Sequence, residues 1–164
     1  MPLGFRPATP DDEPFLRAML YEAVYWRSIR TGTGPPFEEG MAAAGVGDSI
    51  SDWGLRSGDT AVICESDSIP AGAVWYRFYD ESNAIRGYVD ERTPVIVIAV
   101  ASEHRRRGIG TRLMNAIIDR ARKSGIPRLS LMVSGDNPAR ALYDKCGFVV
   151  SAEAGDSYLM IRDV

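Results

Sequence analysis

The sequence has little material for metal or disulfide chemistry. Among its 164 residues there is one histidine, His104, and there are two isolated cysteines, Cys64 and Cys146. None of these residues has the close paired spacing of a zinc ligand set, so we expect no metal site. Two separate cysteines in an intracellular chain are most often free thiols, and we therefore expect no disulfide.

Long apolar runs and a secretory leader are also lacking. No stretch approaches the roughly 18 consecutive apolar residues that a membrane span needs. The first residues, MPLGFRPATPDDEPF, show no basic segment followed by an apolar one, which is the pattern of a secretory signal. These observations predict a cytoplasmic protein that does not act at a membrane.

Positive charge is scarce over the whole chain but concentrated in one segment. The chain has 19 Lys and Arg against 22 Asp and Glu, a formal net charge of −3 and a pI near 5.2. Nucleic-acid-binding domains are usually strongly basic, so we expect no nucleic-acid partner. Seven basic residues nevertheless lie between Arg105 and Lys123. Length and composition, with 45% hydrophobic and 25% charged residues, predict a single domain over residues 1–164.

Hydrophobic periodicity predicts an α/β chain with a mixed sheet. Strands are expected at 3–9, 60–66, 71–80, 94–102, 128–133, 147–153 and 157–164, and helices at 13–29, 38–45, 108–123 and 136–146. The strand at 94–102 is a continuous β-branched run, which is typical of a strand covered on both faces. The piece from 94 to 134 is predicted to be a right-handed crossover between two parallel strands.

Three consecutive arginines, Arg105 to Arg107, stand in an unfavourable place, just before the helix expected at 108–123. Each cation at a helix N-terminus costs about 0.3–1 kcal/mol, because that end carries partial positive charge. A bound phosphate would neutralise the arginines and satisfy the free N–H groups there, and Gly108 and Gly110 would let it approach the backbone. Solvated surface charges on a loop are the alternative. The segment is neither a P-loop, since G-K-[ST] is missing, nor a dinucleotide fingerprint, since Leu113 replaces its third glycine.

Two motifs resemble the GCN5-related N-acetyltransferase (GNAT) superfamily. The segment RRRGIG is similar to its acyl-CoA signature [QR]-x-x-G-x-[GA], filled by Arg105, Gly108 and Gly110. The segment NPARALYDKCGF at 137–148 resembles its N-x-x-A-x-x-[LY]-Y-x-x-x-G-F motif, with the small residue displaced by one or two positions. The resemblance is sharp over 94–150, looser over 5–16 and absent as a motif over 28–58.

The resemblance implies a GNAT-like α/β fold with an acetyl-CoA site. The expected sheet is mixed, mostly antiparallel, of about seven strands with a splayed parallel central pair, and is flanked by about four helices. The pantetheine arm would bind the backbone of Ile98, Ala99 and Val100, for which plain core packing is the alternative. The pyrophosphate, or the ribose 3′-phosphate, would bind the loop formed by Arg105, Arg106, Arg107, Gly108, Ile109, Gly110 and Thr111.

The second motif implies two further site residues. Asn137 matches the asparagine that faces the cofactor arm, although N-capping of the next helix is an equal alternative. Tyr143 matches the tyrosine that protonates the departing thiolate. A thiolate with a pKa near 8.5 is a better leaving group beside an O–H donor, and a neutral tyrosine with a pKa of ~10 is such a donor. The alternative for Tyr143 is aromatic packing within the short helix.

The general base and the acceptor are left open by the sequence. Histone-acetylating members carry a glutamate where this chain has Pro94, which argues against histone-type acetylation. The base candidates are Glu22, Asp90, Glu91, Glu103 and Ser134 acting through a water, and His104 is interpreted as a surface residue. The acceptor pocket is expected near the N-terminal helices and the 80–92 turn. Candidate pocket residues, each with core packing or a solvated helix face as the alternative, are Tyr21, Tyr25, Trp26, Trp53, Trp75, Tyr76, Glu22, Glu38 and Glu39.

The predicted function is therefore direct transfer of an acetyl group from acetyl-CoA to a primary amine, without an acyl-enzyme and without a metal. The acceptor would be a small molecule or a protein N-terminus. The alternative is a non-catalytic acyl-CoA-binding or sensing domain, which would need the arginine–glycine loop but not Tyr143. A homodimer is compatible with the sequence, which does not determine the oligomeric state.

Overall fold

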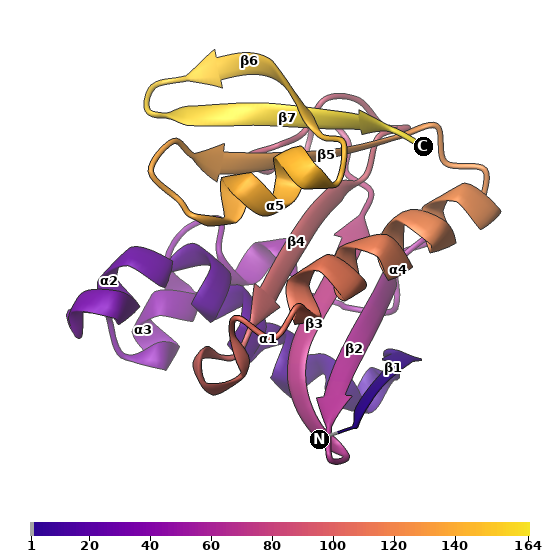
Figure 1. The fold of residues 1–164 in the computed structure, drawn as a ribbon. Coiled ribbons are helices and arrows are strands. Elements are labelled where there is room, and N and C mark those ends of the chain that lie inside the picture. The colour runs from indigo at the N-terminus through magenta and orange to yellow at the C-terminus, as the bar shows by residue number, and fades with distance from the viewer. Residues whose placement is uncertain (1) are drawn as a thin grey trace.

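The computed structural model describes residues 2–164, which build one seven-stranded sheet with helices on both faces (Figure 1). The sheet order is β1-β2-β3-β4-β5-β7-β6. The strands are β1 (Leu3–Pro7), β2 (Thr60–Ser66), β3 (Ile69–Arg77), β4 (Val95–Val100), β5 (Arg128–Ser134), β6 (Val149–Ala154) and β7 (Ser157–Asp163). The helices are α1 (Glu13–Val24), α2 (Trp26–Thr31), α3 (Phe37–Ala42), α4 (Ile109–Lys123) and α5 (Ala139–Lys145). The predicted mixed, mostly antiparallel sheet of seven strands is confirmed.

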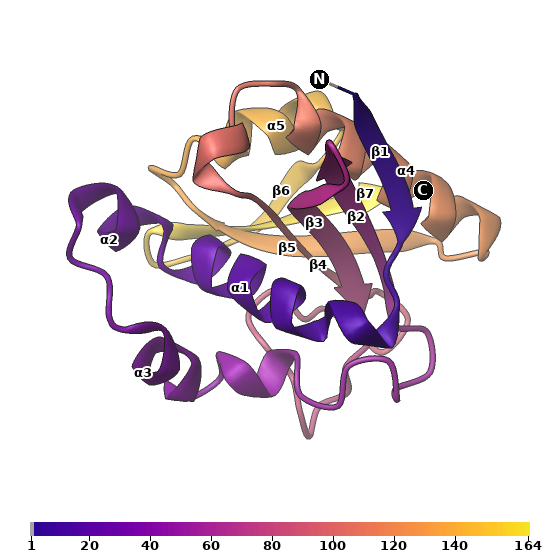
Figure 2. The same ribbon diagram turned by 90° about the horizontal axis from the view of Figure 1, so that it is seen from below.

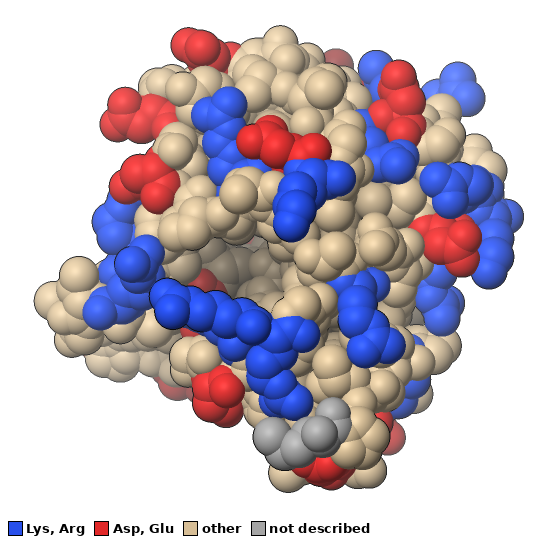
Figure 3. All heavy atoms as spheres, in the orientation of Figure 1, with Lys and Arg blue, Asp and Glu red and all other residues tan. Residues whose placement is uncertain are grey.

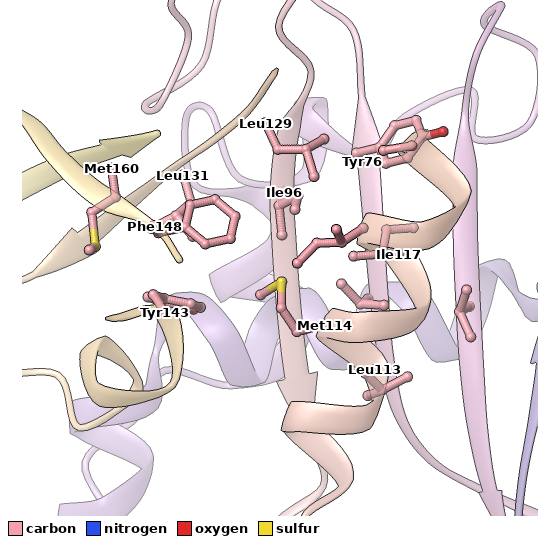
Figure 4. Close-up of a cluster of buried hydrophobic side chains, with 14 of the residues drawn as sticks. Tyr76, Ile96, Leu113, Met114, Ile117, Leu129, Leu131, Tyr143, Phe148 and Met160 are labelled. Carbon is pink, nitrogen blue, oxygen red and sulfur yellow. The ribbon is translucent and has the colours of Figure 1, made fainter. Parts of the chain in front are cut away.

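The layers follow from the alternation of side chains along the strands. Helix α1 covers one face of the sheet, and α4 and α5 cover the other (Figures 1 and 2). On the α4 face the buried side chains include Ile96, Leu113, Ile117, Leu131 and Met160, and Figure 4 shows them on α4 and on the neighbouring strands. The buried side chains on the α1 face include Leu16, Leu20, Ile50, Ile63 and Trp75. The central strands are therefore covered on both faces, as the run at 94–102 predicted.

The helix expected at 13–29 is divided in two, which gives five helices instead of about four. The backbone leaves helical geometry at Tyr25, with φ −101° and ψ 21°. Contacts with α3 and the residues just before it accompany the bend: the hydroxyls of Tyr21 and Tyr25 donate to the carbonyls of Pro35 and Gly40. A Cβ at Gly40 would lie 2.9 Å from Tyr25 Cε2, so glycine is what allows this close approach. Periodicity alone could not predict the bend, because its cause lies in another segment.

The parallel pair β4 and β5 separates soon after it begins. Their register contains the pair Val95↔Ser130, where Ser130 N donates to Pro94 O at 3.1 Å. By contrast, β4 pairs with β3 along its whole length, from Val95↔Arg77 to Val100↔Gly72. The edge of β4 that faces β5 therefore has no strand partner beyond Val95, and a V-shaped opening forms in the centre of the sheet.

Within residues 2–164, no helix combines the length and the apolar character needed to cross a bilayer. In the same residues, no group of three or more His, Cys, Asp or Glu side chains is placed to hold a metal ion.

Candidate active site

A cavity of about 1000 Å³ occupies the opening between β4 and β5. Figure 3 shows a hollow with basic side chains along its lower edge. The lining of the cavity includes Arg105 and Arg106. Most of the predicted cofactor residues line it, namely Ile98, Ala99, Val100, Arg105, Arg106, Gly108, Ile109, Gly110, Asn137 and Tyr143. Arg107 and Thr111, which were also predicted, do not. A smaller hollow of about 460 Å³ near the C-terminal end of α4 contains none of the predicted site residues.

The loop between β4 and α4 has the backbone geometry of an anion site. Gly108 caps α4 with φ 75°, and Arg106 has φ 61°. A non-glycine residue in this left-handed region is unusual and is found most often where a ligand or a tight turn requires it. Among the described residues, no group accepts a hydrogen bond from the backbone N–H groups of residues 106–111. Successive free N–H groups at a helix start bind anions by their charge and direction.

The three adjacent arginines have three different environments. Arg105 donates from Nε to Val100 O at 3.0 Å and from Nη2 to Glu22 Oε2 at 2.9 Å, so it joins the loop to α1. Arg107 turns away from the cavity, and its Nη1 donates to His104 Nδ1 at 2.9 Å. Arg106 makes no side-chain hydrogen bond or salt bridge with any residue from 2 to 164, and it lines the cavity. Arg106 is therefore the guanidinium of this loop that is free for an anion.

Asn137 and Tyr143 come from the turn and helix that follow β5. Asn137 Oδ1 accepts a hydrogen bond of 2.9 Å from the N–H of Ala139, the first residue of α5, although Pro138 and not Asn137 occupies the N-cap position. The ring of Tyr143 packs edge-on against Phe148, with centroids 6.1 Å apart (Figure 4). The residue is 8% exposed, and burial raises the pKa of its phenol to about 12. The hydroxyl therefore stays protonated near neutral pH, as a hydrogen-bond donor must.

The candidate bases are distributed unevenly around the cavity. Glu22 and Ser134 line it, but Glu22 is bound to Arg105. Asp90 lies elsewhere, in a salt bridge of 2.8 Å with Arg128, and Glu91 and Glu103 are also outside the lining. His104, which the sequence analysis took for a surface residue, is partly buried and lines the cavity through the same loop as Arg106.

Most of the candidate acceptor residues have structural roles instead. Trp26 is the aromatic of the candidate set that lines the cavity. Trp75 and Tyr76 are buried in the core, and Trp53 packs edge-on against Trp75 with centroids 6.5 Å apart. Glu38 and Glu39 are exposed on α3 and are absent from the cavity lining. They therefore lie on a solvated helix face, which was the alternative to a role in the acceptor pocket.

Sequence analysis missed two cationic residues of the cavity wall, Arg30 and Arg86. Arg86 belongs to the 80–92 turn, which was expected near the acceptor. No motif marks it, because its position depends on how the turn rests on β5.

The comparisons with known proteins identify a family and agree with this fold. Residues 22–148 match the family model described as acetyltransferase (GNAT) family. The chain is 28% identical over 147 residues to an L-2,4-diaminobutyric acid acetyltransferase of Nocardia farcinica (strain IFM 10152), covering 80% of this chain and 72% of that protein.

Solved structures share the fold at lower identity. The PaiA N-acetyltransferase of Thermoplasma acidophilum in complex with coenzyme A has a TM-score of 0.68 and 17% identity, with 100% of each chain covered. A phosphinothricin acetyltransferase of Sinorhizobium meliloti in complex with acetyl-CoA has a TM-score of 0.68 and 21% identity, covering 100% of this chain and 89% of that one. Because the family model spans most of the sequence, and the mixed sheet with its parallel central pair is consistent with it, this chain belongs to the GNAT family of acetyltransferases.

Proposed function

We propose that this protein is an N-acetyltransferase that moves an acetyl group directly from acetyl-CoA to a primary amine of a small molecule or a protein N-terminus. The observation that carries the proposal is the juxtaposition of two features in one cavity. One is the row of free N–H donors at residues 106–111, of which 106 and 108–110 line the cavity, and the other is the buried, protonated phenol of Tyr143. We further propose that residues 1–164 act as one domain.

The cavity suits coenzyme A in shape and in chemistry. The free N–H groups of the loop and the guanidinium of Arg106 would hold the pyrophosphate. The unpaired edge of β4 offers backbone donors and acceptors to the amide groups of a pantetheine arm, much as a neighbouring strand would. When bound, acetyl-CoA supplies the acetyl group as an activated thioester.

The residues of the chain then have distinct tasks in the transfer. A bond forms between the amine nitrogen and the acetyl carbonyl carbon, and the carbon–sulfur bond breaks. Tyr143 donates its proton to the sulfur, and it is reprotonated by the proton that the amine nitrogen loses. That proton travels through water, and of the candidate bases Ser134 and the Arg105-bound Glu22 are the ones that line the wall.

Direct transfer is supported by the positions of the two cysteines, neither of which lines the cavity. Cys64 is buried in the core, and burial raises the pKa of both thiols. A thiol with a raised pKa away from the cavity is a poor nucleophile for an acyl-enzyme pathway.

The relative from Nocardia farcinica supports a small amine as the acceptor, since its name specifies diaminobutyric acid. A small molecule also suits a cavity of about 1000 Å³ that must hold part of coenzyme A.

The proposal is tested by ligand binding and by thiol release. Acetyl-CoA should raise the melting temperature, because a ligand that binds the native state stabilises it. Release of coenzyme A thiol should then depend on an amine from a panel of small amines and peptides. Binding without turnover on any amine would favour the sensing domain over the enzyme, and no thermal shift at millimolar acetyl-CoA would contradict both.

A further inference from the structure

The charges on the cavity wall are mostly positive. The charged lining residues are Glu22, Arg30, Arg86, Arg105 and Arg106. The carboxylate of Glu22 is already bound to Arg105 at 2.9 Å, so it offers no free negative charge. Arg30 and Arg86 form no salt bridge with any residue from 2 to 164. The expectation that acidic residues attract a cationic amine is therefore opposed by the charges that surround the cavity.

Arg86 is held in place by the turn that follows it. Gly87 has φ +100°, and its carbonyl accepts a hydrogen bond of 2.7 Å from Ser130 Oγ on β5. A Cβ at this glycine would lie 3.0 Å from Val95 Cγ1 and 3.3 Å from Met132 N. The turn is thus fixed against the point where β4 and β5 separate. The backbone position from which the Arg86 side chain extends is therefore fixed as well.

The side chain of Arg86 extends along the face of the sheet on which the turn at Gly87 lies. Its Nη2 donates to Ser157 Oγ at 2.9 Å, and Ser157 pairs with Ser134 at the far end of β5. Ser157 is 7% exposed and is neutral, so it orients the guanidinium without neutralising it. The remaining N–H groups of Arg86 stay available to a ligand.

Arg86 lies on the opposite side of the sheet from the proposed phosphate site. Leu131 and Val133 of β5 point into the core beneath α4 and α5. Ser130 has the opposite parity and binds the turn at Gly87. The turn and Arg86 are therefore on the α1 side of β5, whereas Tyr143 and the start of α4 are on the other side. A molecule bound at Arg86 would reach the opening between β4 and β5 from the side that the coenzyme does not occupy.

We propose, resting on the acetyltransferase function above, that the acceptor is an amine that also carries a carboxylate, and that Arg86, oriented by Ser157, binds this carboxylate. A guanidinium binds a carboxylate through two parallel N–H donors, which fixes the orientation as well as the position of the acid group. The amine of the same molecule is then directed toward the opening, where the acetyl group would lie. Small amino acids with a second amino group fit this description, and simple diamines do not.

The test compares matched acceptors on matched variants. The acceptors are L-2,4-diaminobutyrate with its carboxamide, and L-lysine with lysinamide, each assayed for kcat/KM at saturating acetyl-CoA. We expect the wild type to favour the acid of a pair by about tenfold or more, the size of one charge-assisted interaction. Arg86→Met should abolish this preference by raising KM for the acid, with KM for acetyl-CoA unchanged. Arg92→Met is the control, because Arg92 is an exposed residue of the same segment outside the cavity lining.

Several results would overturn the inference. Equal use of acids and amides by the wild type would do so, and so would a preference that survives in Arg86→Met. If acetyl-CoA binds but no acceptor turns over, calorimetric binding of the same pairs in the presence of coenzyme A decides, and equal affinity for acid and amide counts against it. Failure of acetyl-CoA to bind at all would instead contradict the acetyltransferase function itself. The thermal transition of Arg86→Met, compared with that of Arg92→Met, verifies that the variant is folded.

Discussion

Arg77 and Arg106 have the same side chain, but the surroundings of their guanidinium groups are opposite. Arg77 at the end of β3 is fully buried and donates to Asp59 at 2.8 and 2.7 Å and to the carbonyls of Ser49 and Ser51. Arg106 has no partner among residues 2–164. A buried charge is stable only when its hydrogen bonds are complete, whereas a charge that serves a ligand must keep its donors free. The comparison separates a structural arginine from one whose donors are free for a ligand, without reference to any motif.

The hydrogen bonds of Arg77 also hold part of the cavity wall in place. Arg77 and the hydroxyl of Tyr79 both donate to Ser49 O, at 3.3 and 2.9 Å. Ser49 lies in the cavity wall together with Val46. The segment between α3 and β2 has little regular structure, so these bonds to its carbonyls are what fixes this part of the wall.

The largest effect on stability is expected from replacing Arg77, the structural arginine. Arg77→Met leaves the carboxylate of Asp59, 2% exposed, without its counter-charge. The free energy of unfolding should fall by about 3–5 kcal/mol, the cost of an unpaired buried charge. Chemical denaturation measures this change. The double variant Arg77→Met/Asp59→Asn should recover part of it, and a single variant as stable as the wild type would remove the distinction drawn here.

The second prediction concerns Tyr143, whose neutral phenol lines the cavity between β4 and β5. Tyr143→Phe keeps the edge-on packing against Phe148 but removes the proton donor. Turnover should fall by about 10²-fold, the lower range for loss of a general acid, with little change in acetyl-CoA affinity. Single-turnover kinetics and calorimetric titration separate the two quantities. A loss of affinity as large as the loss of turnover would show that Tyr143 only shapes the site.

The third prediction concerns the salt bridge between Arg6, an arginine of intermediate exposure, and Asp12. Its hydrogen bonds to Asp12, helped by Thr9 N, lower the pKa of that carboxyl from 3.8 to about 2. Since the folded-state pKa is depressed, the stabilisation is present above about pH 4 and is lost as the pH falls toward 2. Asp12→Asn should therefore lower stability by about 1–2 kcal/mol at pH 7, allowing for solvent screening. In denaturation curves the difference from the wild type should shrink as the pH falls below about 4 and should disappear only below about pH 2, and a constant difference would exclude the linkage.

The smallest effect separates two neighbours in the loop before α4. Arg106→Ala should weaken acetyl-CoA binding by about tenfold, as loss of one charge-assisted contact does. Arg107→Ala is the matched control, since that side chain is turned toward His104 and Ser66. The two affinities are measured at low and high salt, and the Arg106 effect should decrease as salt rises. Equal effects of both substitutions would mean that charge near the loop, not position, determines affinity.

What the sequence predicted well is local along the chain. The run 94–123 contains the strand, the turn residues and the helix of the loop region, and each is specified by neighbours within a few positions. The pairing of Val95 with Ser130 and the separation that follows agree with the expected splayed pair. The family motifs identified most of the loop residues that line the cavity, but they also included Arg107 and Thr111, which do not line it, and they did not indicate His104, which does.

What the sequence missed depends on contacts between distant segments. Arg86 became part of the cavity through the bond between Ser130 and Gly87, which are far apart in the chain. Trp75 and Tyr76 are successive strand residues, and aromatic type alone did not show that both faces of β3 are covered. The bend at Tyr25 depends on Pro35 and Gly40, which periodicity within the helix cannot register.

The early separation of β4 from β5 has a mechanical consequence. The sheet consists of two blocks, β1–β4 and β5–β7, and within residues 2–164 the hydrogen bonds between their strands lie only near Val95 and Ser130. A molecule that contacts both the free edge of β4 and the start of α5 braces the two blocks across the gap. Amide hydrogen exchange along both strands should therefore slow together when such a molecule binds, because the brace completes a seam that the polypeptide itself leaves open.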